Sequence, residues 1–258
     1  MLFSHPLAFE AVIFDLDGVI TRTASTHLDA WKKLFDDYLL QREHDKGEPF
    51  SPFTQADYLS WVDGKPRYEG VASFLESRSI EIPWGTPADP PDVQSICGLG
   101  NRKNEAFNQL LREKGVEVYP SSVAMLHELK KAGVRLGVAS SSKNCRNVLV
   151  AADLLHLFDA RVDGLTSDDL NLKGKPEPDI FIRACEMVGA IPADSVVIED
   201  AVSGVQAGSK GNFGLVVGIA RNNNASALKE NGADLVVADL EELNGVDGLN
   251  ESFIKRLF

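Results

Sequence analysis

Short apolar runs rich in β-branched residues recur along the chain, and each is followed by a polar or glycine-containing turn. A helical pattern of apolar residues then leads to the next run. The clearest runs are Ala11–Phe14, Val134–Ala139, Val196–Ile198, Leu215–Ile219 and Leu235–Val237. Strands that alternate with amphipathic helices at this spacing predict an α/β fold with a doubly wound, parallel, Rossmann-like sheet.

One long segment, from Thr26 to Arg112, lacks a convincing pattern for a buried strand. An apolar helical face with i, i+3, i+4, i+7, i+8 spacing is formed there by Trp31, Leu34, Phe35, Tyr38 and Leu39. Further helices are expected over 69–76 and 102–114. The proline-rich stretch 82–92 between them is expected to be a loop.

This helical segment follows directly after the first predicted strand, and it divides the chain into two expected domains. Residues 1–24 and 113–258 form the α/β core, and residues 25–112 form a helical cap. Ligands of doubly wound folds bind at the carboxyl ends of the strands, so an insert at this point is expected to act as a lid. Its expected hinges are 21–25 and 112–120.

Side chains that can carry out chemistry lie at four points of the chain: three directly follow predicted strands, and one introduces a helix. Asp15 and Asp17 follow the first strand, Ser140 follows the second, Lys175 introduces a later helix, and Glu199-Asp200 follows another strand. The carboxyl ends of parallel strands meet at one edge of the sheet, so these groups are expected to converge on one crevice.

The gathered groups fit phosphoryl transfer that depends on magnesium. Asp15 can attack phosphorus to form an aspartyl phosphate, and Asp17 can exchange a proton with the leaving or accepting oxygen. Ser140 and backbone N–H groups can hold the phosphoryl oxygens, and Lys175 can neutralise charge between nucleophile and phosphate. Each piece taken alone is also compatible with a turn, a helix cap or a surface lysine, and it is their combination that favours this chemistry.

The motifs at these positions resemble those of the haloacid dehalogenase superfamily. They read FDLDGVIT over 14–21, ASSSKN over 139–144, GKPEPD over 174–179 and VIEDAVSG over 197–204. The helical insert resembles the small cap of the β-phosphoglucomutase subfamily. The resemblance implies Mg²⁺ as cofactor, with Asp15, Asp17, Glu199 and Asp200 as the metal-site residues. It leaves open whether Glu199 binds the metal directly or only positions Asp200.

The cap carries further similarities to the mutase pattern. Thr23 and His27, followed by Trp31, resemble residues that couple cap closure to acid/base positioning. Gly64 and Arg67 resemble a loop that binds the substrate phosphate, although Val62 and Asp63 ahead of Gly64 depart from the subfamily pattern.

Two more groups of residues complete the expected substrate site. Lys103 and Asn104 resemble a second cap element that contacts the sugar phosphate. On the core side, Ser141, Ser142, Lys143 and Asn144 are expected to support the phosphate or the sugar hydroxyls.

The activity implied is conversion of β-glucose 1-phosphate to glucose 6-phosphate through β-glucose 1,6-bisphosphate. A mutase must hold a bisphosphate in two orientations and needs a second phosphate site, which Arg67 and Lys103 can form. The alternatives are a phosphatase acting on small sugar phosphates and, in another class, a non-catalytic phospho-receiver or binding module. Receivers are about half as long and carry no cap.

Composition limits the possible partners. A formal net charge of −12 argues against nucleic acid, whose phosphate backbone needs a basic stripe. Nowhere do about 18 apolar residues run together as a membrane span requires. The N-terminus has no signal-peptide pattern, and three widely spaced cysteines suggest a reducing compartment. We therefore expect a cytoplasmic monomer or weak dimer that binds a small sugar phosphate.

Overall fold

The computed structural model describes residues 6–221 and 223–257. The expectation that the N-terminus carries no signal peptide therefore concerns residues that lie partly outside the described range. The described chain divides into two compact units. Unit 1 comprises residues 1–22 and 117–258, and unit 2 comprises Thr23–Val116. The sequence-based boundaries lie after residues 24 and 112 instead.

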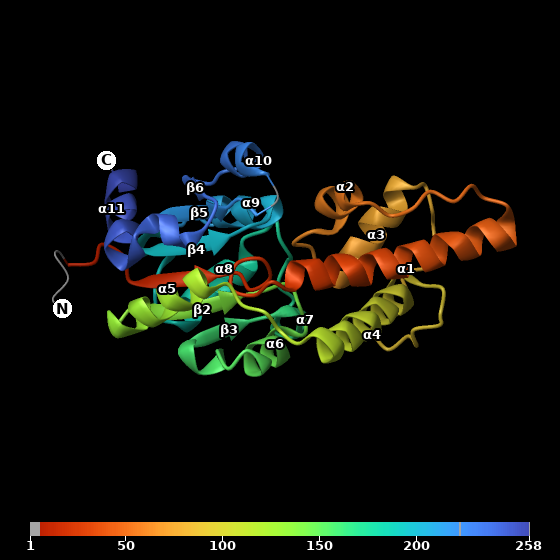
Figure 1. The fold of residues 1–258 in the computed structure, drawn as a ribbon, viewed down its shortest axis with the longest axis horizontal. Coiled ribbons are helices and arrows are strands. Elements are labelled where there is room, and N and C mark those ends of the chain that lie inside the picture. Colours follow the sequence, from red (N-terminus) through yellow and green to blue (C-terminus); the bar gives the residue numbers. More distant parts are fainter. Residues whose placement is uncertain (1–5, 222, 258) are drawn as a thin grey trace. The chain divides into compact units, whose positions relative to one another are not determined.

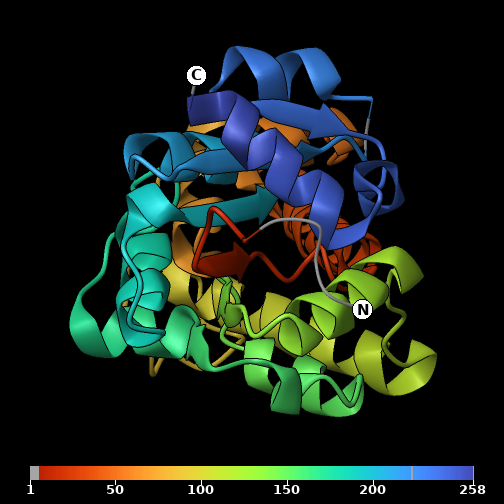
Figure 2. The ribbon, with the colours of Figure 1, turned by 90° about the vertical axis from the view of Figure 1, so that its left-hand side faces the viewer.

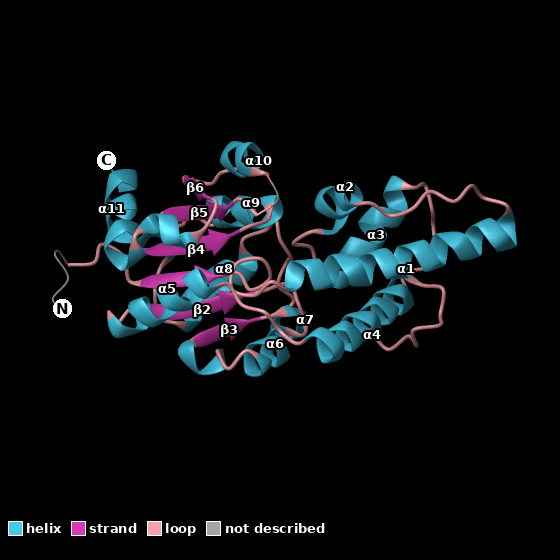
Figure 3. Ribbon diagram, in the orientation of Figure 1, coloured by secondary structure: helices cyan, strands magenta, loops and turns pink. Residues whose placement is uncertain are grey.

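The sheet of unit 1 has six strands, all parallel, in the order β3-β2-β1-β4-β5-β6 (Figures 1 and 3). The strands are β1 Ala11–Phe14, β2 Arg135–Ala139, β3 Ala160–Val162, β4 Ser195–Glu199, β5 Leu215–Ile219 and β6 Leu235–Val237. The chain runs outward from β1 to one edge and, from β4, to the other. The predicted doubly wound fold is confirmed, and its topological switch point lies between β1 and β4.

Helices cover both faces of this sheet. They are α5 Pro120–Lys131, α6 Cys145–Ala151, α7 Gly164–Leu170, α8 Asp179–Met187, α9 Val202–Lys210, α10 Ala225–Glu230 and α11 Gly245–Leu257. Helices α8 and α9 pack against the central strands on one side, while α5 and α11 lie together on the other (Figure 2). The buried apolar residues between α8, α9 and the sheet include Ile13, Phe181 and Val205.

The pattern-based elements of unit 1 match well, with one exception. Strand β3 has only three residues and was not predicted from the sequence. Its segment is too short for a period-2 pattern to stand out from the surrounding turns. It pairs with β2 from Gly137 to Ala139, where a longer neighbour supplies the ladder.

Helices are the only regular secondary structure among the described residues of unit 2, as predicted, and loops connect them. Its helices are α1 Thr23–Lys46, α2 Gln55–Asp57, α3 Arg67–Ser77 and α4 Ile96–Lys114, with a π-helical turn at Tyr58–Val62 (Figure 3). Helix α4 begins six residues before the predicted start of 102. Ser95 caps it by accepting a hydrogen bond from the N–H of Gly98, and the two glycines in its first turns hide the helical pattern.

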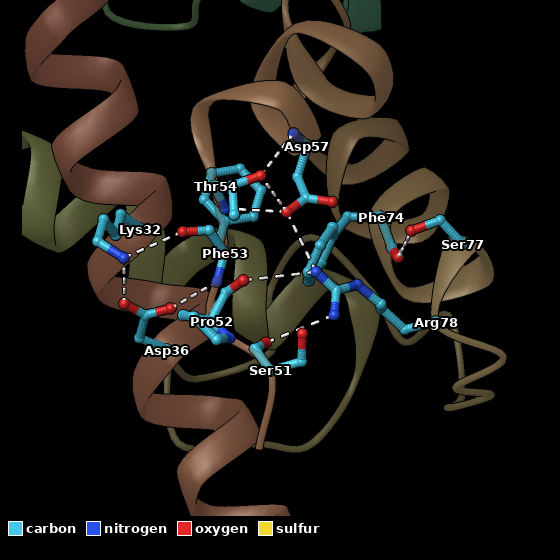
Figure 4. Close-up of polar contacts among 10 residues, drawn as sticks. All are labelled: Lys32, Asp36, Ser51, Pro52, Phe53, Thr54, Asp57, Phe74, Ser77 and Arg78. Carbon is cyan, nitrogen blue, oxygen red and sulfur yellow. Dashed lines mark hydrogen bonds and ion pairs between the residues drawn. The ribbon is translucent and has the colours of Figure 1, made fainter. Parts of the chain in front are cut away.

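Aromatic side chains form the core of unit 2. Trp31 stacks on Phe35 with ring centroids 5.3 Å apart, and Phe35 packs on Phe74 at 4.1 Å. A polar cluster fastens the connection between α1 and α3 around this core (Figure 4). There Asp36 accepts from the N–H of Phe53, and Arg78 donates to Asp57.

The two chain segments at the unit boundary are joined to each other within unit 1. Arg22 N–H donates to the carbonyl of Glu117 at 2.8 Å, and Tyr119 N–H donates to the carbonyl of Ile20. Thr21 and Val118 form an isolated antiparallel bridge. The backbone pairing begins at residue 117, so the second segment of the core unit starts four residues later than the sequence suggested, and residues 113–116 belong to unit 2. No helix among the described residues is long and apolar enough to span a bilayer.

Candidate active site

A buried ion cluster lies at the carboxyl end of β1. Asp15 directly follows the strand and donates its backbone N–H to the carbonyl of Ile198 on β4. The Lys175 ammonium donates to Oδ1 of Asp15 and, at 2.5 Å, to Oε1 of Glu199. All three side chains are buried. Three residues distant in the sequence thus meet at the switch point of the sheet.

The charges in this cluster do not balance. Burial raises the pKa of the Asp15 carboxyl well above its ordinary value, and although Lys175 lowers it, Glu199 and Asp17 raise it further. Burial lowers the pKa of Lys175, but the carboxylates of Asp15 and Glu199 outweigh it and raise the net value. One ammonium thus faces several carboxylates, and the excess negative charge is the condition that a bound cation would relieve.

Asp17 lies in the turn that follows Asp15, and the side chain of Asp200 lies against this turn at Gly18. Gly18 has a positive φ of 86°, and a Cβ added to it would lie 1.9 Å from Oδ2 of Asp200. Only glycine therefore fits here, both for its backbone conformation and for the close approach of the Asp200 carboxylate. Glu199, on the other side, accepts from the N–H of Ala201 through Oε2 at 2.6 Å.

The donor atoms in this region are oxygens, as magnesium prefers. Within 6–221 and 223–257, no three His, Cys, Asp or Glu side chains are already gathered closely enough to hold a metal by themselves. Magnesium commonly takes only one or two carboxylates and completes its shell with phosphate and water. The residue types and the excess negative charge therefore fit this ion.

The serine-rich loop after β2 is built by its own hydroxyls. Ser140 is buried, and its Oγ accepts from the N–H of Ser142 at 3.1 Å. Ser142 Oγ in turn accepts from the N–H of Asn144 at 3.2 Å. The ammonium of Lys143 pairs with Asp168. The hydroxyl contacts show that Ser140 and Ser142 shape the loop, and Ser141 lies between them.

A second cluster of predicted residues lies in unit 2. Lys103 is buried on α4, and its Nζ lies 2.5 Å from Nδ1 of His27 on α1. The same ammonium lies over the rings of Trp31 at 4.9 Å and Phe107 at 4.7 Å. The His27 ring stacks on Phe107 with centroids 4.0 Å apart. Trp31 is thereby placed in the core of unit 2, beneath the lysine.

The remaining predicted residues of unit 2 lie at the start of α3 and on α4. The Arg67 guanidinium donates through Nη2 to Oδ1 of Asn104 at 2.8 Å. Gly64, with a φ of 72°, forms the turn that leads into α3. Thr23 is the first residue of α1 and is buried. The structure brings His27, Trp31 and Lys103 together, and separately Arg67 and Asn104.

Several residues of these clusters were not singled out from the sequence. In unit 1, Arg221 Nε donates to the carbonyl of Gly18 at 3.1 Å, and Asn224 Nδ2 donates to the carbonyl of Asp200 at 3.0 Å. Both follow the end of β5, so the strand-end rule that indicated the other residues could have found them. In unit 2, Asn101 bonds the hydroxyl of Tyr68 at 3.0 Å. No pattern in the sequence indicates that contact.

Fold and site together define an α/β enzyme of the phosphomutase and phosphatase type. A family model described as haloacid dehalogenase-like hydrolase matches residues 9–212, and the chain belongs to this family. The chain is 49% identical over 242 residues, 92% of each protein, to a β-phosphoglucomutase of Mycobacterium bovis. It is 34% identical over 236 residues, 91% of each, to one of Bacillus subtilis.

A solved structure extends the similarity to three dimensions. The β-phosphoglucomutase of Clostridium difficile superposes with a TM-score of 0.78 at 27% sequence identity. The match covers 96% of this chain and 99% of that one. The resemblance inferred from the strand-end motifs is confirmed by sequence and by fold.

Proposed function

We propose that this chain is a phosphomutase of the β-phosphoglucomutase type, interconverting β-D-glucose 1-phosphate and glucose 6-phosphate through β-glucose 1,6-bisphosphate. The observation that carries the proposal is the buried contact between Asp15 and the ammonium of Lys175. A carboxylate beside a fixed cation can attack an anionic phosphoryl group as nucleophile. The 49% identity to a β-phosphoglucomutase, over 92% of each protein, supports this reaction.

The chemistry takes two half-reactions. In the first, a carboxylate oxygen of Asp15 bonds to the C1 phosphorus of β-glucose 1,6-bisphosphate while the bond from that phosphorus to the C1 oxygen breaks, and Asp17 gives this oxygen a proton, so that glucose 6-phosphate leaves. In the second, the C6 hydroxyl of β-glucose 1-phosphate returns a proton to Asp17 and attacks the aspartyl phosphate, which releases Asp15 and forms the bisphosphate again. Ser140 is proposed to hold phosphoryl oxygens, and Lys175 to neutralise charge during both displacements.

Asp15, Asp17, Glu199 and Asp200 are the residues proposed to hold Mg²⁺. The support is the oxygen donor set and the negative charge of Glu199 and Asp17, which adds to burial in raising the pKa of Asp15. When bound, the ion would neutralise that charge and polarise the phosphoryl oxygens.

Unit 2 is proposed to bind the part of the substrate that does not react. Arg67 and Lys103 carry the charges for a second phosphate, which a bisphosphate intermediate requires. Other residues of unit 2 would contribute to that site or to acid/base positioning, namely Asn104, Gly64, Trp31, Thr23 and His27. Ser141, Ser142, Lys143 and Asn144 would contact the sugar or phosphate from unit 1. A cytoplasmic location and a monomeric or weakly dimeric state remain predictions from the sequence.

Phosphorus NMR tests the proposal directly. The protein is incubated with β-glucose 1-phosphate, magnesium and a trace of β-glucose 1,6-bisphosphate, with the α-anomer as a parallel control. We expect the glucose 6-phosphate signal to grow as that of the β-anomer falls, with little inorganic phosphate. Inorganic phosphate without glucose 6-phosphate would instead identify a sugar-phosphate phosphatase. A phospho-receiver would show no sustained turnover of either kind.

A further inference from the structure

The proline-rich loop 83–93 of unit 2 lies in the connection between α3 and α4 (Figure 1), and hydrogen bonds join several of its residues to α4. At its start, the carbonyls of Pro83 and Trp84 accept from the N–H groups of Ile96 and Cys97 at 2.9 and 3.0 Å. Near its end, the carbonyl of Pro91 accepts from Nε of Arg102 at 2.7 Å. Backbone carbonyls of the loop thus bind the first two turns of the helix.

The interior of the loop is held by Asp89. Its carboxylate accepts from the hydroxyls of Thr86 at 2.9 Å and Ser95 at 2.5 Å, and Ser95 also caps α4. These hydrogen bonds lower the pKa of the Asp89 carboxyl, so it is ionised and accepts strongly. At Gly98 a Cβ would lie 2.3 Å from the carbonyl oxygen of Val93, so the loop lies directly on the helix backbone. The loop is therefore held by hydrogen bonds in its interior as well as by its contacts with α4.

Asn101 connects this loop to the residues proposed to bind phosphate. Its Nδ2 donates to the carbonyls of Pro87 at 3.1 Å and Asp89 at 2.9 Å. Its Oδ1 accepts from the hydroxyl of Tyr68 at 3.0 Å. One amide therefore satisfies two loop carbonyls and fixes the position of the Tyr68 ring.

Tyr68 and its neighbours in turn confine Arg67. A Cβ on Gly100 would lie 2.6 Å from the Tyr68 ring and 3.3 Å from Cδ of Arg67, so both side chains lie directly on the helix at this point. Arg67 then reaches Asn104, one turn further along α4. Gly100, Lys103 and Asn104 share one helical face by their i, i+3, i+4 spacing.

We propose that the loop 83–93 positions the guanidinium of Arg67 for the non-reacting phosphate of the substrate, and that Asn101 is the positioning residue through which it acts. This rests on the proposed function insofar as Arg67 contacts that phosphate. Arginine is long and rotamer-rich, so ordering it before binding improves affinity without any new contact to the ligand. The loop is thus part of the specificity for substrates that carry a non-reacting phosphate.

The test compares two substrates in matched variants of the full chain. Asn101→Ala removes the connection, and Gln109→Ala is the control, because Gln109 is an exposed amide on the same helix whose Nε2 donates to Glu113. We expect Asn101→Ala to raise KM for the sugar phosphate about tenfold, with kcat nearly retained. For 4-nitrophenyl phosphate, whose single phosphate is the reacting group and which therefore has no non-reacting phosphate, kcat/KM should fall far less. Gln109→Ala should change neither KM for the sugar phosphate nor kcat/KM for 4-nitrophenyl phosphate.

A double variant separates positioning from general loss of structure. If Asn101 acts through Arg67, adding Asn101→Ala to Arg67→Ala should change sugar-phosphate kcat/KM less than about twofold. Full additivity of the two losses would overturn the proposal, as would equal losses on both substrates. Should Asn101→Ala fail to fold, Tyr68→Phe removes one oxygen of the same connection. It should give the same substrate preference at about threefold, and no preference would also overturn the proposal.

Failure of this inference can be told apart from failure of the proposed function. The reaction class is read from the wild type alone, by whether glucose 6-phosphate or inorganic phosphate forms. The role of Asn101 is read from the ratio of sugar-phosphate to aryl-phosphate kinetics between variants. That ratio can be measured whichever product the wild type makes.

Discussion

Each unit of the molecule buries one lysine at its proposed functional cluster, and the two lysines are held in different ways. Lys175 in unit 1 is 2% exposed, and Lys103 in unit 2 is 4% exposed. Both ammonium groups lie over aromatic rings, Lys175 over Phe181 and Lys103 over Trp31 and Phe107. Lys175 additionally contacts the carboxylates of Asp15 and Glu199, and Lys103 contacts the imidazole of His27.

The difference teaches how similar burial can serve two purposes. A buried charge must be paired or well solvated by polar groups, and Lys175 meets this requirement with anions of its own chain. It is therefore a fixed part of the site, and it keeps Asp15 and Glu199 in place. Lys103 is held by ring faces and a histidine, which suits a cation whose proposed role is to meet an anionic ligand. The predictions below test this contrast, from the largest expected effect to the smallest.

Replacing the nucleophile should abolish the chemistry of unit 1. Asp15→Asn keeps the shape of the side chain but cannot form the aspartyl phosphate, so we expect turnover to fall by at least about 10⁴-fold. The rate of glucose 6-phosphate formation, followed by phosphorus NMR, checks this, with circular dichroism as the control for folding. Turnover within tenfold of the wild type would mean that Asp15 is not the nucleophile.

Removing each lysine should separate the two modes of burial. Lys175→Met leaves two buried carboxylates without their cation, and we expect the free energy of unfolding of unit 1 to fall by about 3 kcal/mol. Lys103→Met replaces a cation on ring faces by an apolar chain of similar length, and we expect a loss of about 1 kcal/mol or less for unit 2. Urea unfolding followed by fluorescence and circular dichroism measures both.

The pH dependence gives a second reading of the same contrast. The pKa of Lys175 is raised in the folded chain. Its stabilising contribution is therefore complete below the ordinary lysine pKa and disappears only as the pH rises through the raised value. The difference between wild type and Lys175→Met should accordingly shrink in strongly alkaline solution. Equal losses for the two lysine variants at neutral pH would contradict the distinction drawn between them.

Much of unit 1 could be predicted from the sequence because its rules are local. Asp15, Ser140 and Glu199 each lie at the end of an apolar run, and parallel strands bring their ends to one edge. Which carboxylates Lys175 contacts could not be predicted, since the choice of Asp15 and Glu199 is made by tertiary packing. Strand β3 was missed because three residues carry no periodicity.

Unit 2 was less accessible to sequence reasoning. The stripe containing Trp31 correctly indicated a helix, but the same stripe cannot distinguish a core residue from a ligand contact. Asn101 belongs to the segment that resembles a cap element, but its contacts were not predicted, because its partners are two loop carbonyls and one hydroxyl, which leave no spacing to recognise. The role assigned to the loop 83–93 therefore comes from contacts alone.

Truncating the arginine of unit 2 should damage one reaction more than another. For Arg67→Ala we expect kcat/KM for the sugar phosphate to fall about 10- to 100-fold, because a charge-assisted contact to one phosphate is lost. Hydrolysis of 4-nitrophenyl phosphate, which depends on unit 1, should fall less than about threefold. Steady-state kinetics on both substrates measures the split, and equal loss on both would show that Arg67 is structural.

The smallest expected effect concerns an ion pair of unit 2 that involves neither lysine. Asp57 accepts from the N–H and hydroxyl of Thr54 at 2.9 and 2.7 Å and from Arg78 at 3.1 Å (Figure 4). Burial opposes its ionisation, but these hydrogen bonds and the charge of Arg78 outweigh burial and lower the pKa of the carboxyl. A lowered pKa contributes stability above the ordinary aspartate value, and that contribution is lost as the pH falls through the folded value.

Asp57→Asn should therefore lower the free energy of unfolding of unit 2 by about 1 kcal/mol at neutral pH and by less in acid, with turnover unchanged. Asp37→Asn is the matched control, because Asp37 pairs with Lys33 on the exposed face of α1, where an ion pair contributes little. Urea unfolding at neutral and acid pH measures the difference. A loss that stays the same in acid would show that Asp57 acts through packing, since the charge of its carboxylate would then contribute nothing that protonation removes.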